Sequence, residues 1–179
     1  MFIDIETSSL YADIGRLIVA GFLKDQEETF FFVENPQEEK SVLENVVEYL
    51  KKVKNEKIYV WNASFDIPFL ISRCLKHGVE AKVIMQLKII DLLKFSREVL
   101  RFSSNRLDDV SSFFDIEKNI KVTGRHVQKL YEEFLSGNKA MKDEIINHCR
   151  DDLISLSKIY EKVKDLVEVW ENKQRNSLF

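Results

Sequence analysis

The chain has 179 residues, of which 45% are hydrophobic and 11% aromatic, enough to build the core of one ordinary domain and too apolar for a disordered protein. Two cysteines are too few for a disulfide framework or a zinc site, and the net charge of −3 excludes a protein that coats nucleic acid by charge alone. No apolar run approaches the ~20 residues of a membrane span, and the acidic start does not resemble a signal peptide. We therefore expect a single cytoplasmic domain over residues 1–171 with no membrane contact.

Apolar runs and turn signals predict three strands at the start of the chain, over residues 1–6, 16–24 and 28–34, with a tight turn at 25–27. Helical spacing of Val42, Val46 and Leu50 then predicts an amphipathic helix over 38–54, and a short buried strand is expected at 58–61. A second helix is predicted from about Phe65 and ends at Gly78, a suitable C-terminal cap.

The remaining chain is predicted to be mostly helical. We expect a strand near 82–85 and helices around 90–100, around 107–114, from 125, and from about 139 to 170. Three strands, a helix, another strand and then mainly helices predict an α/β fold with a mixed sheet. Residues 172–179 are polar until the last two and are expected to form a C-terminal tail, with a frayed helix end as the alternative.

Asp4 and Glu6 are the most informative pair in the sequence. Successive side chains of a strand alternate between its faces, so both carboxylates point to the same side. Ile3 and Ile5 lie on either side of Asp4, and the next predicted strand is apolar, which indicates a buried position rather than a solvated edge. Two carboxylates this close repel each other, and a bound multivalent cation is the usual remedy.

A second polar group follows the predicted strand at 58–61. Asn62, Ser64 and Asp66 lie where that strand leads into a helix, and Pro68 places Asp66 in the first helical turn. Helix capping alone is one explanation. Capping needs only one such residue, however, and the carboxyl ends of strands are where α/β sheets bind ligands.

The third group lies within the long C-terminal helix. One face of this helix carries Asp152 together with apolar residues, so we expect its carboxylate to be buried against the sheet and paired or bound to metal. The other residues on that face are Ile145, Cys149, Leu156, Ile159 and Val163. His148 lies one turn before Asp152 and projects to the same side, whereas Asp151 is expected to face solvent.

Together, these groups resemble the three ordered motifs of the DEDD 3′–5′ exonucleases, which have a ribonuclease-H-like fold, and they are most similar to the predicted exonucleases of the YprB type. The motifs are Asp4-x-Glu6, Asn62-x-x-Phe65-Asp66 and His148-x-x-x-Asp152. The resemblance covers roughly the whole chain. It implies a mixed five-stranded sheet flanked by helices, with the acids converging at the centre of the sheet.

The resemblance also implies two divalent ions, Mg²⁺ or Mn²⁺, which prefer hard oxygen ligands. Asp4 would bridge both ions, Glu6 and Asp152 would complete the site of the attacking water, and Asp66 would hold the second ion. His148 would orient or deprotonate the water. The expected activity releases nucleoside 5′-monophosphates from a 3′ end.

The histidine spacing departs from the family pattern. The branch with histidine usually places it five residues before the last aspartate, a position that Asn147 occupies here, and His148 has the spacing of the tyrosine branch. The resemblance further implies substrate contacts from Thr7, Asn62, Phe65 and Leu10, although plain core packing is an alternative for Leu10. Asp91 and Leu92 resemble a family element that a helix start explains equally well.

The expected partner is nucleic acid with a 3′ end, single-stranded DNA in preference to RNA. Residues 82–130 hold ten Lys and Arg against six Asp and Glu, and we expect this segment, with Phe95 and Phe102, to hold the strand; ordinary solvated helix faces are the alternative. Gln174 and Phe179 suggest a weak contact of the tail with a sliding clamp. We expect a monomer.

Three other functions stay open at this point. An endonuclease on the same fold is the nearest alternative, followed by a binding module that has lost activity and a haloacid-dehalogenase-like phosphatase. The last would need a helix soon after the first acids, where this sequence predicts strands.

Overall fold

A computed structural model describes residues 1–117 and 124–176 of the protein. Its centre is a five-stranded mixed sheet with the strand order β3-β2-β1-β4-β5. Strands β1 (Phe2–Thr7), β2 (Leu17–Lys24) and β3 (Glu27–Phe32) form an antiparallel meander, and β4 (Lys57–Val60) and β5 (Lys88–Asp91) continue the sheet in parallel with β1. The predicted mixed five-stranded sheet is therefore confirmed.

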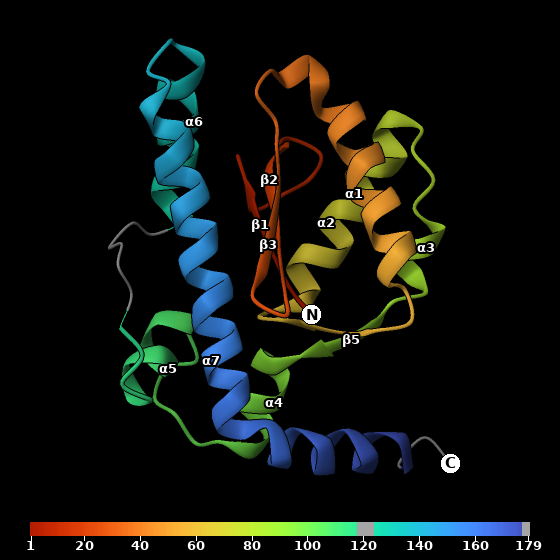
Figure 1. The fold of residues 1–179 in the computed structure, drawn as a ribbon, viewed down its shortest axis with the longest axis vertical. Coiled ribbons are helices and arrows are strands. Elements are labelled where there is room, and N and C mark those ends of the chain that lie inside the picture. The colour runs from red at the N-terminus through yellow and green to blue at the C-terminus, as the bar shows by residue number, and fades with distance from the viewer. Residues whose placement is uncertain (118–123, 177–179) are drawn as a thin grey trace.

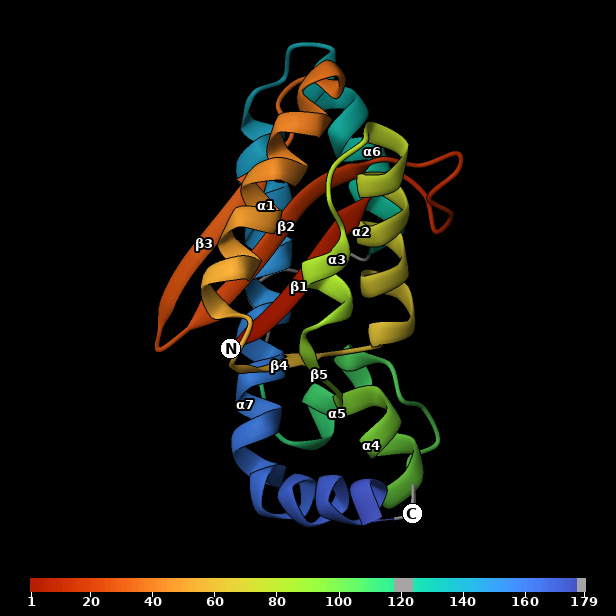
Figure 2. The same cartoon turned by 90° about the vertical axis from the view of Figure 1, so that its right-hand side faces the viewer.

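Helices cover both faces of this sheet (Figures 1 and 2). Helices α1 (Glu39–Val53), α2 (Ala63–His77) and the short α3 (Lys82–Met85) lie on one face, and a 3₁₀ turn (Pro36–Glu38) leads into α1. The opposite face carries α6 (Gly124–Leu135) and the long α7 (Ala140–Asn176), with α4 (Leu92–Val99) and α5 (Leu107–Phe113) packed against α7. No helix within the described residues has both the length and the apolar composition needed to cross a bilayer.

Local chemistry sets the ends of several elements. Asp25 and Gln26 have φ values of 48° and 69°, so the β2–β3 hairpin closes through a two-residue turn of the kind that matches the twist of paired strands. Gly78 has a φ of 66° and ends α2 as predicted, with its N–H and that of Val79 donated to the last carbonyls of the helix.

The predicted strand at 82–85 is wrong. Lys82–Met85 forms the helix α3, and the fifth strand is Lys88–Asp91. Two short apolar runs stand close together here, and a run of this length cannot be assigned to strand or helix from its periodicity alone. The run that pairs with β4 becomes the strand.

Two other boundaries differ from expectation. Helix α4 begins at Leu92 rather than at Ile90, because Asp91 ends β5 and caps the helix through bonds to the N–H groups of Leu93 and Lys94. Helix α7 continues to Asn176, so the first five residues of the predicted tail are helical, and residues 177–179 lie outside the described part of the chain.

Phe95 is not available for base stacking, contrary to expectation. It is 1% exposed and packs edge-on against Trp170, with ring centroids 5.7 Å apart. Phe102 packs against Phe113 and Phe114. Phe95 and the partly buried Phe102 and Phe114 belong to the core beneath α4, α5 and α7, whereas Phe113 is 64% exposed. The basic side chains at positions 118, 121 and 125 of this segment lie outside the described residues.

Gly21 allows α7 to approach the sheet closely, beside the strand that carries the first acids. Gly21 lies opposite Asp4 in the β1–β2 pairing. A Cβ at this position would lie 2.5 Å from Cys149 Sγ and 3.0 Å from Leu153 Cδ1, both on α7. Because Gly21 has no side chain, α7, which carries His148 and Asp152, can lie close to the sheet.

We expect Gly21→Ala to lower the free energy of unfolding by about 1–3 kcal/mol, the usual cost of overpacking a core. Urea unfolding of the single variant, of Cys149→Ala and of the double variant measures this effect. Because the clash falls mainly on Cys149 Sγ, the double variant should regain part of the loss. Strictly additive losses would show that the glycine is not required for this contact.

Candidate active site

The first two acids of the site lie on the central strand, β1. Ile3 and Ile5 point into the core under α1 and α2, so the alternation of the strand directs Asp4 and Glu6 to the opposite face, beneath α7. Glu6 is 7% exposed, and one carboxylate oxygen of Asp4, Oδ2, is buried. Glu6 is therefore buried as predicted, whereas Asp4 is partly buried.

Asp66 approaches the same place from α2, in the first turn of the helix. It is 3% exposed. Desolvation raises the pKa of its carboxyl well above the usual range, the charges of Glu6 and Asp91 add to this rise, and hydrogen bonds from the backbone N–H groups of Ile5 and Asp66 itself oppose it.

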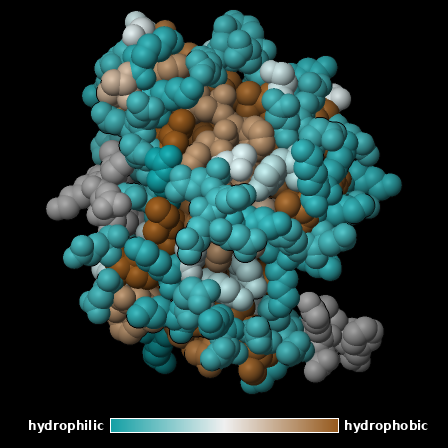
Figure 3. Space-filling view, viewed as in Figure 1, coloured by the Kyte–Doolittle hydropathy of each residue, from teal (hydrophilic) through white to brown (hydrophobic). Residues whose placement is uncertain are grey.

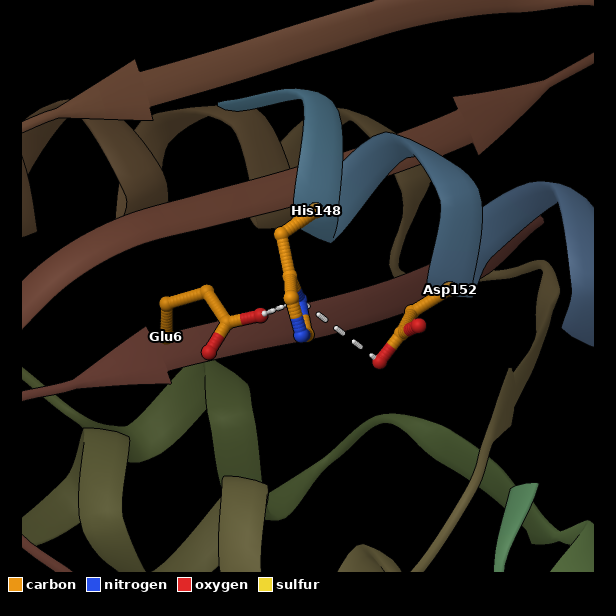
Figure 4. Close-up of side chains that lie close together, drawn as sticks. All are labelled: Glu6, His148 and Asp152. Carbon is orange, nitrogen blue, oxygen red and sulfur yellow. Dashed lines mark ion pairs between the residues drawn. The ribbon is translucent and has the colours of Figure 1, made fainter. Parts of the chain in front are cut away.

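His148 and Asp152 extend from α7 toward Glu6 (Figure 4). Nδ1 of His148 lies 2.7 Å from Glu6 Oε1 and 3.9 Å from Asp152 Oδ2. One potential ligand atom from each of the three residues lies within 4.8 Å of the other two. His148 is 6% exposed, and the Asp152 side chain is 19% exposed, at the open side of the group.

The Asp4 carboxylate is surrounded by the negative charge of other acidic residues. Burial is the largest cause that raises the pKa of Asp4 well above its ordinary range, and the charges of Glu6, Asp152 and Asp66 raise it further. Among the described residues, no group donates a hydrogen bond to Asp4 Oδ2. A buried carboxylate oxygen without a donor, surrounded by three other carboxylates, fits a divalent cation with hard oxygen ligands.

Asp151 is buried, at 7% exposure, and does not face solvent as expected. The prediction treated the side of α7 that faces away from the sheet as open. Helices α5 and α6 pack along α7, so this helix is covered on more than one side. The apolar face was predicted correctly: Ile145, Cys149, Leu156, Ile159 and Val163 are all buried.

The four residues predicted to contact substrate lie on the elements that carry the acids or on the β1–β2 loop. Thr7 Oγ1 donates to Ser9 O at 2.8 Å and shapes the start of the β1–β2 loop, which projects beyond the sheet (red, right side of Figure 2). Leu10 in this loop is 76% exposed, which excludes core packing. Leu10 and Phe65 line the same groove of about 460 Å³, and Asn62 accepts a 2.6 Å bond from Ser64 Oγ.

Sequence reasoning missed a buried ion pair behind this loop. Glu39 and Arg73 are 2% and 3% exposed, and Arg73 also donates to Ala12 O within the loop at 2.9 Å. The only signals were an acid in the first turn of one predicted helix and a base in the middle of the next. Neither spacing nor periodicity relates two residues 34 positions apart.

The molecular surface around these elements is mostly hydrophilic, with apolar side chains gathered over the sheet in the upper centre of Figure 3. Phe30, Phe31 and Phe32 of the edge strand β3 are only partly buried. Lys142 and Arg150 of α7 cover two of these rings, Phe32 and Phe30, at 5.4 Å and 5.1 Å from their centroids.

A mixed sheet of this order, with carboxylates on its central strand facing a helical aspartate, defines a ribonuclease-H-like domain. Residues 1–164 match the family model of the RNase H superfamily, and the chain belongs to this superfamily.

Similar known proteins include a polymerase subunit and a polymerase. DNA polymerase III subunit epsilon of Buchnera aphidicola subsp. Acyrthosiphon pisum (strain APS) is 26% identical over 172 residues, which cover 93% of this chain and 68% of that protein. The family B DNA polymerase of the hyperthermophilic archaeon Pyrobaculum calidifontis shares the fold with a TM-score of 0.77 at 19% identity. That match covers 90% of this chain but only 24% of the polymerase.

Proposed function

We propose that this chain is a 3′–5′ exonuclease of the DEDD type that hydrolyses nucleic acid with the help of two divalent cations. The observation that carries the proposal is the convergence of four carboxylates, from β1, α2 and α7, around the buried and donorless Oδ2 of Asp4. A domain without a ligand at this place gains nothing from such a repulsive group.

Asp4, Glu6, Asp66 and Asp152 are the residues that we assign to Mg²⁺ or Mn²⁺. When bound, the cations would activate a water molecule and neutralise the charge that develops on the scissile phosphate. Asp4 would share in holding the cations with the other three acids, whose charges all raise its pKa.

His148 is the residue that we assign to the attacking water. Its Nδ1 lies 2.7 Å from Glu6 Oε1, and we assign to its imidazole the role of orienting the water or accepting its proton. The tyrosine-like spacing of His148 therefore does not remove it from the site, because one helical turn separates it from Asp152 and both reach Glu6.

DNA is the substrate that we favour, because the similar proteins are by name a subunit of a DNA polymerase and a DNA polymerase. We propose a single strand as the form of this substrate, with the groove lined by Leu10 and Phe65 as its contact. The YprB type, the monomeric state, the strand contact of the basic segment and the clamp contact of residues 172–179 stay proposals. Gln174 of that segment donates to Glu98 at 3.0 Å.

The test of the proposed function compares linear with circular single-stranded DNA in Mg²⁺, in Mn²⁺ and in chelator. We expect a linear oligonucleotide labelled at its 5′ end to shorten progressively from the 3′ end, with nucleoside 5′-monophosphates as products. The circle, which has no 3′ end, should stay intact. Cleavage of the circle would identify an endonuclease, and intact linear DNA with both metals and folded protein would refute the nuclease assignment.

We expect Leu10→Ala to raise KM for single-stranded DNA by about threefold to tenfold with a smaller effect on kcat, because the variant loses an apolar contact of about 0.7–1.4 kcal/mol, roughly one or two buried CH2 groups, and the chemistry lies elsewhere. Steady-state kinetics on a short oligonucleotide measure the two constants. Ile14→Ala is the control, since Ile14 is 74% exposed in the same loop but does not line the groove. Equal effects of the two variants would remove Leu10 from the substrate contacts.

A further inference from the structure

Asp91, at the end of β5, accepts hydrogen bonds from four backbone N–H groups. Leu93 and Lys94 in the first turn of α4 donate to it at 2.9 Å and 3.2 Å, which is ordinary helix capping. The other two donors belong to a different part of the chain. Asn62 N–H lies 3.2 Å from Oδ1, and Ala63 N–H lies 3.1 Å from Oδ2. A helix cap explains the first pair of bonds but not the second.

The second pair holds the start of α2. Asn62 has φ 76° and ψ 56°, a left-handed conformation that is unfavourable for a residue with a Cβ. The Asn62 side chain does not cap α2, because its Oδ1 accepts from Ser64 Oγ instead. The first N–H groups of α2 are therefore bound by a carboxylate that lies 28 positions further along the chain.

Asp66 follows this turn within the first turn of α2. The direction in which α2 leaves β4 decides where the Asp66 carboxylate meets Asp4 and Glu6. Asp91 lies at the end of the strand that neighbours β4 and accepts hydrogen bonds from Asn62 and Ala63. These bonds tie the start of α2 to the sheet and so constrain the direction of the helix.

We propose that Asp91 is a positioning residue for the metal ligand Asp66: its carboxylate locks the left-handed turn at Asn62 and thereby fixes Asp66 at the cation site. This inference rests on the proposed metal centre. In this proposal Asp91 is not itself a ligand: it acts through the backbone of residues 62 and 63, in addition to the charge that it places near Asp66. Supporting groups of this kind typically change metal affinity by about tenfold to a hundredfold.

Two variants separate this role from capping of α4. In Asp91→Ser the hydroxyl can still cap α4, since serine is as good a cap as aspartate, but its single short oxygen cannot also bond the turn at Asn62. Asp91→Asn keeps one carbonyl oxygen at the position of Oδ1 and replaces the acceptor of Ala63 N–H by an amide. Asn35→Ala is the matched control, because Asn35 caps the 3₁₀ turn before α1 through Gln37 N–H.

The readout is Mn²⁺ binding, followed by electron paramagnetic resonance, which does not require nuclease activity. We expect the apparent dissociation constant to rise about tenfold or more in Asp91→Ser, to rise less in Asp91→Asn, and to stay at the wild-type value in Asn35→Ala. In an Asp66→Asn background, Asp91→Ser should cause no further loss, because the ligand that it positions is already gone.

Wild-type Mn²⁺ affinity in folded Asp91→Ser, or an equal additional loss in the Asp66→Asn background, would overturn the inference and leave Asp91 as a helix cap. Failure of the proposed nuclease function gives a different result. In that case the wild-type protein and the Asp91 variants would still differ in Mn²⁺ binding, while no variant would shorten DNA.

Discussion

Asp4→Asn is expected to lower the rate of DNA hydrolysis by more than about a hundredfold, because even residues that only support metal ligands are worth about tenfold to a hundredfold. The same change should raise the melting temperature of the protein in chelator. Burial and the neighbouring charges raise the pKa of Asp4, so its ionised form is unfavourable without a cation, and asparagine carries no charge.

The matched control is Asp165→Asn, an exposed aspartate of α7. It should leave both the rate and the melting temperature at their wild-type values. Thermal unfolding with and without Mn²⁺ completes the comparison, since the wild-type protein should gain stability from the cation and Asp4→Asn should lose most of this gain. An unchanged gain in Asp4→Asn would show that Asp4 is not a ligand.

Glu39→Gln is expected to lower the free energy of unfolding at pH 7 by about 3–5 kcal/mol, the cost of leaving one member of a buried ion pair without its partner. Two nitrogens of Arg73 lie 2.8 Å and 2.5 Å from the Glu39 carboxylate, which also accepts from Leu17 N–H at 2.8 Å. The pair joins α1, α2 and the start of β2, and glutamine leaves the Arg73 charge buried. Urea unfolding measures the difference.

The effect of Glu39→Gln should depend on pH. Burial on its own raises the pKa of Glu39, but the bonds from Arg73 and Leu17 outweigh it and hold the pKa below its ordinary value. A carboxyl with a lowered pKa contributes stability above its unfolded pKa of about 4.3 and loses it as the pH falls through the folded pKa. The difference between wild type and Glu39→Gln should therefore be present above about pH 4.3 and shrink below it.

Glu38→Gln is the control for this prediction, since Glu38 is the exposed neighbour of Glu39. It should change the free energy of unfolding by less than about 0.5 kcal/mol, as is usual for surface substitutions. A gap between wild type and Glu39→Gln that widens in acid would contradict the assigned ion pair.

Three of the four acids could be singled out from the sequence because each is a charged residue within an otherwise apolar segment or helix face. Asp4 and Glu6 interrupt an apolar strand, and Asp152 interrupts the apolar face of α7. Alternation and helical periodicity state which side such residues face, so their convergence followed from the order of the elements. Leu10 and Phe65 line one groove, which agrees with their predicted role without testing it.

Other features depend on which elements become neighbours, and a single sequence does not contain this information. Asp151 was expected in solvent because the spacing of apolar residues along α7 does not reveal that α5 and α6 pack against this helix. The sequence left Asp91 between a family element and a helix start, because its bonds to Asn62 and Ala63 require β4 and β5 to be adjacent. The strand at 82–85 failed for a related reason, since pairing with β4 chose the later of two apolar runs.

The measurement that tests the metal-dependent nuclease most directly is a time course on a single-stranded oligonucleotide labelled at its 5′ end, with wild type and Asp4→Asn in parallel, in Mn²⁺ and in chelator. We predict progressive shortening from the 3′ end by the wild-type protein in Mn²⁺ only, and none above background by Asp4→Asn. Shortening in chelator, or equal shortening by both proteins, would contradict the account.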